Sequence, residues 1–197
     1  MLRGEKLGKR FGPRVVLRDA SFQIASGSVL GVVGRNGAGK STLLRLVSGL
    51  MVPSRGRVLW NEESARGLCA LFAPDAPLYR ELTCLENLRF FVGGAPDDAT
   101  LRAHLQEFAL GERHRDFAGD LSSGLRARLG LAVAAYFAAQ GHPILLLDEP
   151  TANLDDAGRA LVEQLVAKHR ARGVTLIATN DARDLSMCDH LFEIPPL

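Results

Sequence analysis

The run Gly34-Arg35-Asn36-Gly37-Ala38-Gly39-Lys40-Ser41-Thr42 constrains the fold more than any other stretch of this chain. It has the pattern of a phosphate-binding loop, a glycine and four residues followed by Gly-Lys-Ser. The apolar run 29–33 before it predicts a buried strand, and residues 41–47 after it predict an amphipathic helix. A glycine-rich loop in this setting predicts an α/β fold built around a nucleoside triphosphate site.

The residue types in this loop suit the chemistry of phosphate binding. Glycines let successive backbone N–H groups point at one anion, and the helix N-terminus adds a partial positive charge. We expect Lys40 to reach the β and γ phosphates and the Ser41 hydroxyl to bind Mg²⁺. The candidate nucleotide-binding residues here are Gly34, Asn36, Gly37, Ala38, Gly39, Lys40, Ser41 and Thr42.

Length and charge narrow the class of protein. The 197 residues suit one domain, and 24 basic residues against 22 acidic ones give a net charge of only +2. This balance does not favour a nucleic-acid partner or a polybasic membrane anchor. No apolar run approaches the ~20 residues that cross a bilayer, so we expect an intracellular chain that reaches a membrane only through a partner.

Short strand patterns and two helical stretches flank this nucleotide site. The runs 2–7, 15–17 and 21–24 predict a small antiparallel sheet. Phe11 lies between the first two runs, and two readings stay open: a ring that stacks on a nucleobase, or a buried core ring. Helical patterns follow from Leu82, with Thr83 and Glu86 as a capping box, and over residues 97–109. Gly93-Gly94-Ala95-Pro96 separates the two helices.

Three further motifs follow in order. Leu121-Ser122-Ser123-Gly124 opens a long apolar helix over residues 126–139. The buried strand 144–147 then ends in Asp148-Glu149-Pro150, and Asn153-Leu154-Asp155 precedes a helix. A last core strand, 174–179, delivers Asn180.

With the phosphate loop, this order of motifs resembles the ATP-binding subunit of an ABC transporter over essentially the whole chain. The resemblance implies a P-loop NTPase core of class α/β with a mainly parallel sheet, a small antiparallel N-terminal β subdomain and an inserted helical subdomain at about residues 77–125. Residues 1–197 would form this single domain, with ATP and Mg²⁺ as its ligands. Asp148 would hold Mg²⁺ through water or beside Ser41, and Glu149 would act as general base on the attacking water.

The resemblance also implies partners. Ser122, Ser123 and Gly124 would form a second anion site that meets the phosphate loop of another subunit, in a homodimer or a dimer with a similar ATPase subunit. Asp155 would lie at that interface. Integral membrane permease subunits would complete the transporter and hold this subunit on the cytoplasmic face of the cell membrane. Leu78-Tyr79-Arg80-Glu81-Leu82 is a candidate docking stretch, or equally a local hydrophobic staple.

Three departures from the family pattern bear on the rate of hydrolysis more than on binding. In the signature stretch, Ser123 replaces the usual first glycine and Leu125 replaces the usual closing glutamine. The usual glutamine after the strand that ends at Ala73 is replaced by Pro74-Asp75, and Asp75 is the candidate substitute. The usual histidine after the last core strand is Asn180, which can donate a hydrogen bond but carries no charge. Because Glu149 is present, we expect ATPase activity.

Only short sequence segments suggest the direction of transport. Residues 43–50, 56–60 and 82–88 look similar to the haem-exporter ATPase subunit of cytochrome c maturation and to ABC-2 type export ATPases in general. They favour a small exporter ATPase, with the haem type first. Two alternatives remain open: an ATP-dependent binding or regulatory module with little hydrolysis, and a soluble ABC protein that does not transport.

Overall fold

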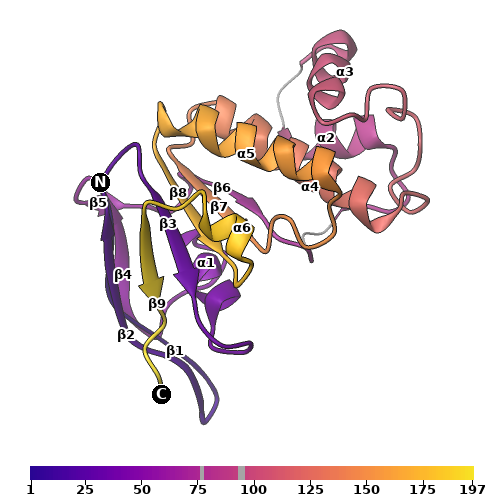
Figure 1. The fold of residues 1–197 in the computed structure, drawn as a ribbon. Helices are drawn as coiled ribbons and strands as arrows, with labels where there is room; N and C mark the ends of the chain where they lie inside the picture. Colours follow the sequence, from indigo (N-terminus) through magenta and orange to yellow (C-terminus); the bar gives the residue numbers. More distant parts are fainter. Residues whose placement is uncertain (76–77, 93–95) are drawn as a thin grey trace.

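Two sheets and a layer of helices make up the protein in the computed structural model, which describes residues 1–75, 78–92 and 96–197 (Figure 1). The larger sheet has five strands in the order β6-β7-β8-β3-β9, and every adjacent pair is parallel. Its strands are β3 (Val29–Val33), β6 (Cys69–Phe72), β7 (Ile144–Asp148), β8 (Val174–Ala178) and β9 (His190–Glu193).

Parallel strands need crossover connections, and helices supply them. The phosphate loop leads from β3 into α1 (Lys40–Val47), which packs between the two sheets (Figure 1). On the opposite face of the parallel sheet lie α4 (Ser123–Ala139) and α5 (Asp156–Arg170). The short α6 (Ala182–Leu185) follows β8. In the described part of the chain, no helix is both long enough and apolar enough to cross a membrane.

The smaller sheet is antiparallel, with the order β2-β1-β4-β5. It consists of β1 (Leu2–Phe11), β2 (Arg14–Ile24), β4 (Arg55–Trp60) and β5 (Glu63–Ser64). The two short runs predicted within residues 15–24 form one strand, because Asp19 adopts a left-handed conformation (φ 49°) where the register with β1 shifts. The two-residue β5 has no alternating apolar pattern and was not predicted.

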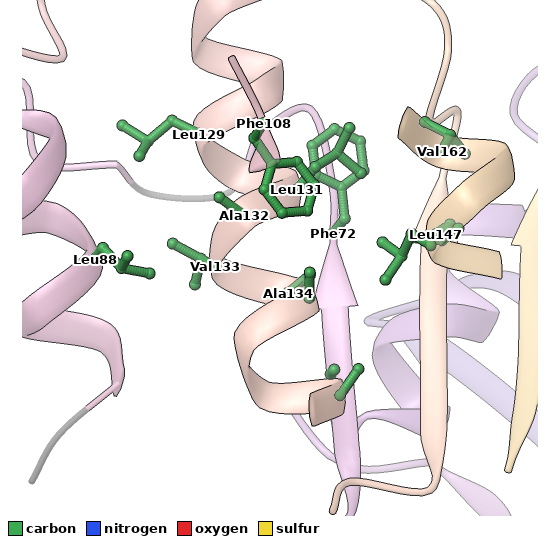
Figure 2. Packing of buried hydrophobic residues seen from close by; sticks show 14 of the residues in the cluster. Phe72, Leu88, Phe108, Leu129, Leu131, Ala132, Val133, Ala134, Leu147 and Val162 are labelled. Carbon is green, nitrogen blue, oxygen red and sulfur yellow. The ribbon is translucent and has the colours of Figure 1, made fainter. Parts of the chain in front are cut away.

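Alternating side chains on the parallel strands divide the core into two clusters. On β7, Ile144 and Leu146 face α1 and the antiparallel sheet, whereas Leu145 and Leu147 face the helices α4 and α5. Figure 2 shows Leu147 and Phe72 on the sheet side of this second cluster and Leu131 of α4 beside them. Burial on both faces explains why the strand reads as a continuous apolar run.

The helical insertion contains α2 (Cys84–Val92) and α3 (Asp98–Glu107), which pack on α4. The predicted capping box is confirmed: the Thr83 N–H donates to Glu86 Oε2 at 2.8 Å, and the Glu86 N–H donates to Thr83 Oγ1 at 3.2 Å. The predicted start of the insertion at Pro77 and the break at residues 93–95 lie outside the described residues. The apolar helix begins at Ser123, three residues before its predicted start.

Candidate functional site

The phosphate loop takes the conformation that its glycines allow. Gly39 has φ 105° and Gly37 has φ 81°, both in the left-handed region that favours glycine. A Cβ atom on Gly39 would also lie 3.1 Å from the carbonyl oxygen of Val16. The ammonium group of Lys40, 7% exposed, curls back over the loop and donates to the Gly34 carbonyl at 3.1 Å. The loop therefore holds a cation above a turn of backbone amides.

A cavity of about 550 Å³ lies over this loop. Arg14 and Val16 line it together with eight predicted residues: Phe11, Asn36, Gly37, Gly39, Lys40, Ser41, Thr42 and Glu149. The buried reading of Phe11 is wrong, because the ring is 48% exposed and its centroid lies 5.2 Å from Lys9 Nζ. Stacking of Phe11 on a base stays a prediction. Arg14 was not predicted, because its place over the loop comes from the pairing of β1 with β2.

Asp148 is suited to bind a metal ion. It ends β7 and is 5% exposed, and this burial raises the pKa of its carboxyl group, while the neighbouring Ser41 hydroxyl opposes the shift. Within the described residues, Asp148 Oδ1 is buried without a hydrogen-bond partner. Mg²⁺ commonly takes only one or two protein oxygens and completes its shell with water and phosphate. The pair Asp148 and Ser41 fits this need, and described residues hold no larger His, Cys, Asp or Glu cluster for a metal.

Glu149 and Asn180 meet at the carboxyl edge of the sheet, because Asp148 of β7 pairs with Ala178 of β8. Glu149 has a left-handed backbone (φ 44°), at a cost of about 1 kcal/mol, and its N–H donates to the Ala178 carbonyl at 2.8 Å. Glu149 Oε1 lies 3.7 Å from Lys40 Nζ. The Asn180 amide donates to Asn36 Oδ1 at 3.3 Å. Both predicted side chains therefore reach the phosphate loop.

Asp75 lies beside this site without lining the cavity over the loop. Its carboxylate forms an ion pair with Arg45 of α1. The charge of Asp75 also raises the pKa of Asp148, although burial of Asp148 is the larger cause. Its predicted role as a substitute for the usual glutamine stays a prediction.

The predicted second anion site opens α4 and faces a different cavity. The Ser122 hydroxyl caps the helix by accepting from the Leu125 N–H at 3.3 Å. Ser123 lines a cavity of about 330 Å³ that Glu149 also borders. A Cβ atom on Gly124 would lie 2.9 Å from the Asn153 carbonyl oxygen, so the helix start packs closely on the chain after β7. None of residues 122–124 is among the described residues that line the cavity over the phosphate loop.

Asp155 is fixed at the start of α5. Its Oδ1 accepts from the Gly158 N–H at 2.8 Å and from Arg128 of α4 at 2.6 Å, and the Gly158 hydrogen bond is the main cause that lowers the pKa of Asp155. The Arg128 side chain is only 12% exposed. This pair ties the helix that begins at Ser123 to the helix that begins at Asp156, and sequence spacing gave no signal for it.

Comparisons with known proteins point to one family. A family model described as "ABC transporter" matches residues 17–152. "Aliphatic sulfonates import ATP-binding protein SsuB 1" of Burkholderia cenocepacia is 42% identical over 184 residues, which cover 90% of this chain and 56% of that protein. The corresponding protein of Burkholderia pseudomallei is 39% identical and is covered to 54%. The chain thus spans little more than half the length of these curated relatives.

Solved structures agree on the fold. A structure described as an ATP-binding subunit of an ABC transporter has a TM-score of 0.86 at 26% identity, covering 98% of this chain and 85% of the other. An ATP-binding cassette in a dimeric, post-hydrolysis state with ADP and Pi has the same TM-score at 22% identity, covering 98% and 94% of the two chains, and supports the fold alone. The predicted fold class, a P-loop core with a parallel sheet and a small antiparallel sheet, is confirmed.

Proposed function

The chain belongs to the ABC transporter family, and from this premise we propose that it is an ATP-binding and ATP-hydrolysing subunit that powers a membrane transporter. ATPase domains of this family bind ATP with Mg²⁺ and couple its hydrolysis to transport. One observation carries the assignment of hydrolysis to this chain: Glu149 borders the cavity over the phosphate loop, with Oε1 3.7 Å from Lys40 Nζ.

Residues that line the cavity and residues beside it have separate roles in this proposal. Lys40 and the loop amides bind the phosphates, and the loop places Ser41 beside Asp148 to hold Mg²⁺, which when bound neutralises charge on the phosphate oxygens. Glu149 orients the attacking water and accepts its proton as general base. Asn180 donates a hydrogen bond to a phosphate oxygen or to this water, and Asp75 is proposed as the substitute for the missing glutamine.

A second subunit is part of this proposal, because residues 122–124 are not among the described residues that line the cavity over the phosphate loop. A head-to-tail dimer, of two copies of this chain or of this chain and a similar ATPase subunit, would bring the Ser122–Gly124 segment of one subunit onto the ATP of the other. Asp155 lies near the same surface, held by Arg128.

For the transported molecule, import of a small organic anion is the first candidate, because the relatives named above are import proteins for aliphatic sulfonates. Export is the second candidate, because the short segments at residues 43–50, 56–60 and 82–88 look similar to those of export ATPases. The haem type within it has no support from the named relatives. A cytoplasmic position on the membrane would follow from docking to a permease. Tyr79, in the stretch 78–82, and Phe90, whose ring packs against it, are both exposed and offer a surface for this docking.

Phosphate release from ATP tests the enzymatic part. We expect Glu149→Gln to lower the Mg²⁺-dependent rate by more than about 100-fold with little change in ATP affinity, because it removes the general base. Glu63→Gln, an exposed carboxylate on β5, is the matched control and should keep the wild-type rate. Equal rates in the wild type and Glu149→Gln would refute hydrolysis and favour the regulatory module.

Purification of the tagged chain from detergent-solubilised membranes, followed by mass spectrometry, tests the transport part. A stoichiometric multi-span partner supports the transporter, and its own binding pocket would separate import of an anion from export. Recovery from the soluble fraction alone, without a membrane protein, would refute the transport proposal in favour of a soluble ABC protein.

A further inference from the structure

A buried carboxylate lies directly behind Glu149, outside the cavity. Asp184 of α6 is 1% exposed. Its Oδ1 accepts from the Thr151 hydroxyl at 2.8 Å and its Oδ2 accepts from the Thr179 hydroxyl at 2.9 Å. In the described part of the chain it forms no ion pair, and burial raises its pKa. A carboxylate buried among neutral donors is destabilising unless its hydrogen bonds are well made, so this arrangement calls for an explanation.

Thr179 connects this carboxylate to Glu149. Its Oγ1 lies 2.9 Å from Asp184 Oδ2 and 3.2 Å from Glu149 Oε2, and it accepts a hydrogen bond from the Asp181 N–H at 3.0 Å. The Thr179 side chain is fully buried. Because Asp148 and Ala178 are paired across β7 and β8, the chain segments that follow these two strands run side by side, and Thr179 fastens one to the other.

The Thr179 hydroxyl has one proton and two carboxylates within reach. The contact with Asp184 is the shorter, and Asp184 is only 1% exposed, so few water molecules compete for it. The hydroxyl is therefore the donor of a three-centre hydrogen bond, whose shorter branch goes to Asp184 Oδ2 and whose longer, weaker branch goes to Glu149 Oε2. A weak contact limits the directions that the Glu149 side chain can take while leaving most of the basicity of its carboxylate.

We propose that Thr179 is a positioning residue for Glu149 and that Asp184 fixes the direction of the Thr179 hydroxyl. With Oε2 held on the side of Thr179, Oε1 is left on the side of Lys40 and the phosphate loop. This inference rests on the proposed ATP hydrolysis, since it assigns Thr179 a part in setting the rate of that reaction. It involves no contact between Thr179 and ATP, so ATP affinity is independent of it.

Two threonine variants separate positioning from stability. Thr179→Val and Thr151→Val each remove one hydroxyl from Asp184, at nearly equal distances, but only Thr179 contacts Glu149. We expect similar falls in Tm for both. We expect kcat for ATP hydrolysis to fall about tenfold in Thr179→Val at an unchanged KM, because the general base loses its orientation, and to stay within about twofold of wild type in Thr151→Val. Thr179→Ser should restore most of kcat. Equal kcat in the two valine variants, or a loss confined to KM, would overturn the proposal.

A double-mutant cycle on thermal unfolding gives a readout independent of turnover. The Tm shifts of Thr179→Val and Glu149→Gln should depart from additivity by about 2 °C, whereas those of Thr151→Val and Glu149→Gln should add. If the Tm shifts of Thr179→Val and Glu149→Gln are additive and the wild type hydrolyses ATP, the positioning role of Thr179 is refuted while the proposed function stands. Absence of hydrolysis in the wild type overturns the proposed function and with it the role of Thr179, even where the coupling is found.

Discussion

Asn87 should be the most important polar side chain for the stability of the helical insertion. It is fully buried, and its Oδ1 accepts from the Tyr79 N–H at 2.8 Å. Its Nδ2 lies 2.9, 3.1 and 3.0 Å from the carbonyl oxygens of Tyr79, Leu82 and Thr83. An amide nitrogen has two protons, so it can satisfy two of these carbonyls at a time. Asn87 thus makes three hydrogen bonds that fold the stretch 78–83 over the start of α2.

The loss on Asn87→Ala follows from this geometry. Each buried hydrogen bond contributes about 1 kcal/mol, so removing three lowers the free energy of unfolding by about 3 kcal/mol. At this chain length, 1 kcal/mol shifts Tm by about 2–4 °C, which gives a fall of about 6–12 °C. Asn87→Asp keeps the shape and the Oδ1 acceptor but turns two donors into an acceptor among three carbonyls. The Tm of Asn87→Asp should therefore fall at least as much as that of Asn87→Ala.

Circular dichroism melts of the nucleotide-free protein measure these shifts, and hydrogen exchange locates them. The Tyr79 amide should lose more protection in Asn87→Ala than the amides of β8, because it loses its own hydrogen bond, whereas the protection of β8 should fall only with the global free energy of unfolding. Thr100→Ala, at an exposed position on α3, is the control and should change Tm little. A decrease in Tm of less than about 2 °C for Asn87→Ala, or an Asn87→Asp variant with the same Tm as the wild type, would refute this prediction.

Three further changes test other parts of the molecule. Asp148→Asn removes a buried carboxyl group whose pKa is raised, so that its ionisation destabilises the fold as the pH rises above about 4. In thermal melts without nucleotide, the variant should have a Tm about 2–4 °C above that of the wild type at pH 7, and this difference should vanish near pH 3. Arg170 lowers the pKa of Asp189, and the resulting ion pair stabilises the fold above about pH 4. This stabilisation is lost as the pH falls through the pKa of Asp189 in the folded state. The urea midpoints of the wild type and Arg170→Gln should therefore differ less at pH 3 than at pH 7. Thr83→Ala removes the capping box of α2 and should lower the free energy of unfolding by about 1 kcal/mol, whereas Thr83→Ser should retain it in the same denaturation assay.

The elements with strong local signals were predictable from the sequence. The strand, loop and helix around Gly34–Thr42 were predictable because each has its own sequence pattern, and the N-cap at Thr83 was predictable from its capping box. The continuity of β2 through Asp19 was not, because it depends on pairing with β1 across a shift in register. Nor was β5, since Glu63 and Ser64 become a strand only by pairing with β4.

The candidate site divides in the same way. Lys40, Asp148 and Glu149 could be identified because motif order marks them. Asp184 could not, because a polar residue four positions after Asn180 in a short helix reads as solvent-exposed. Its burial depends on the neighbouring places of β7 and β8, which bring Thr151 and Thr179 to one carboxylate. Contacts of this kind follow from strand order, and sequence spacing does not encode strand order.

Asn180 shows what a departure from the family pattern keeps and what it loses. Its amide reaches Asn36 in the phosphate loop, so the position still joins the end of β8 to the nucleotide site. A neutral amide gives one directional hydrogen bond but cannot neutralise phosphate charge, as a protonated histidine would. Among the described residues that line this cavity, the cationic side chains are Lys40 and Arg14, and neither depends on the residue at position 180. We therefore expect the replacement of histidine by Asn180 to lower the rate of ATP hydrolysis and to leave ATP affinity unchanged, a difference that separate measurements of kcat and ATP binding would show.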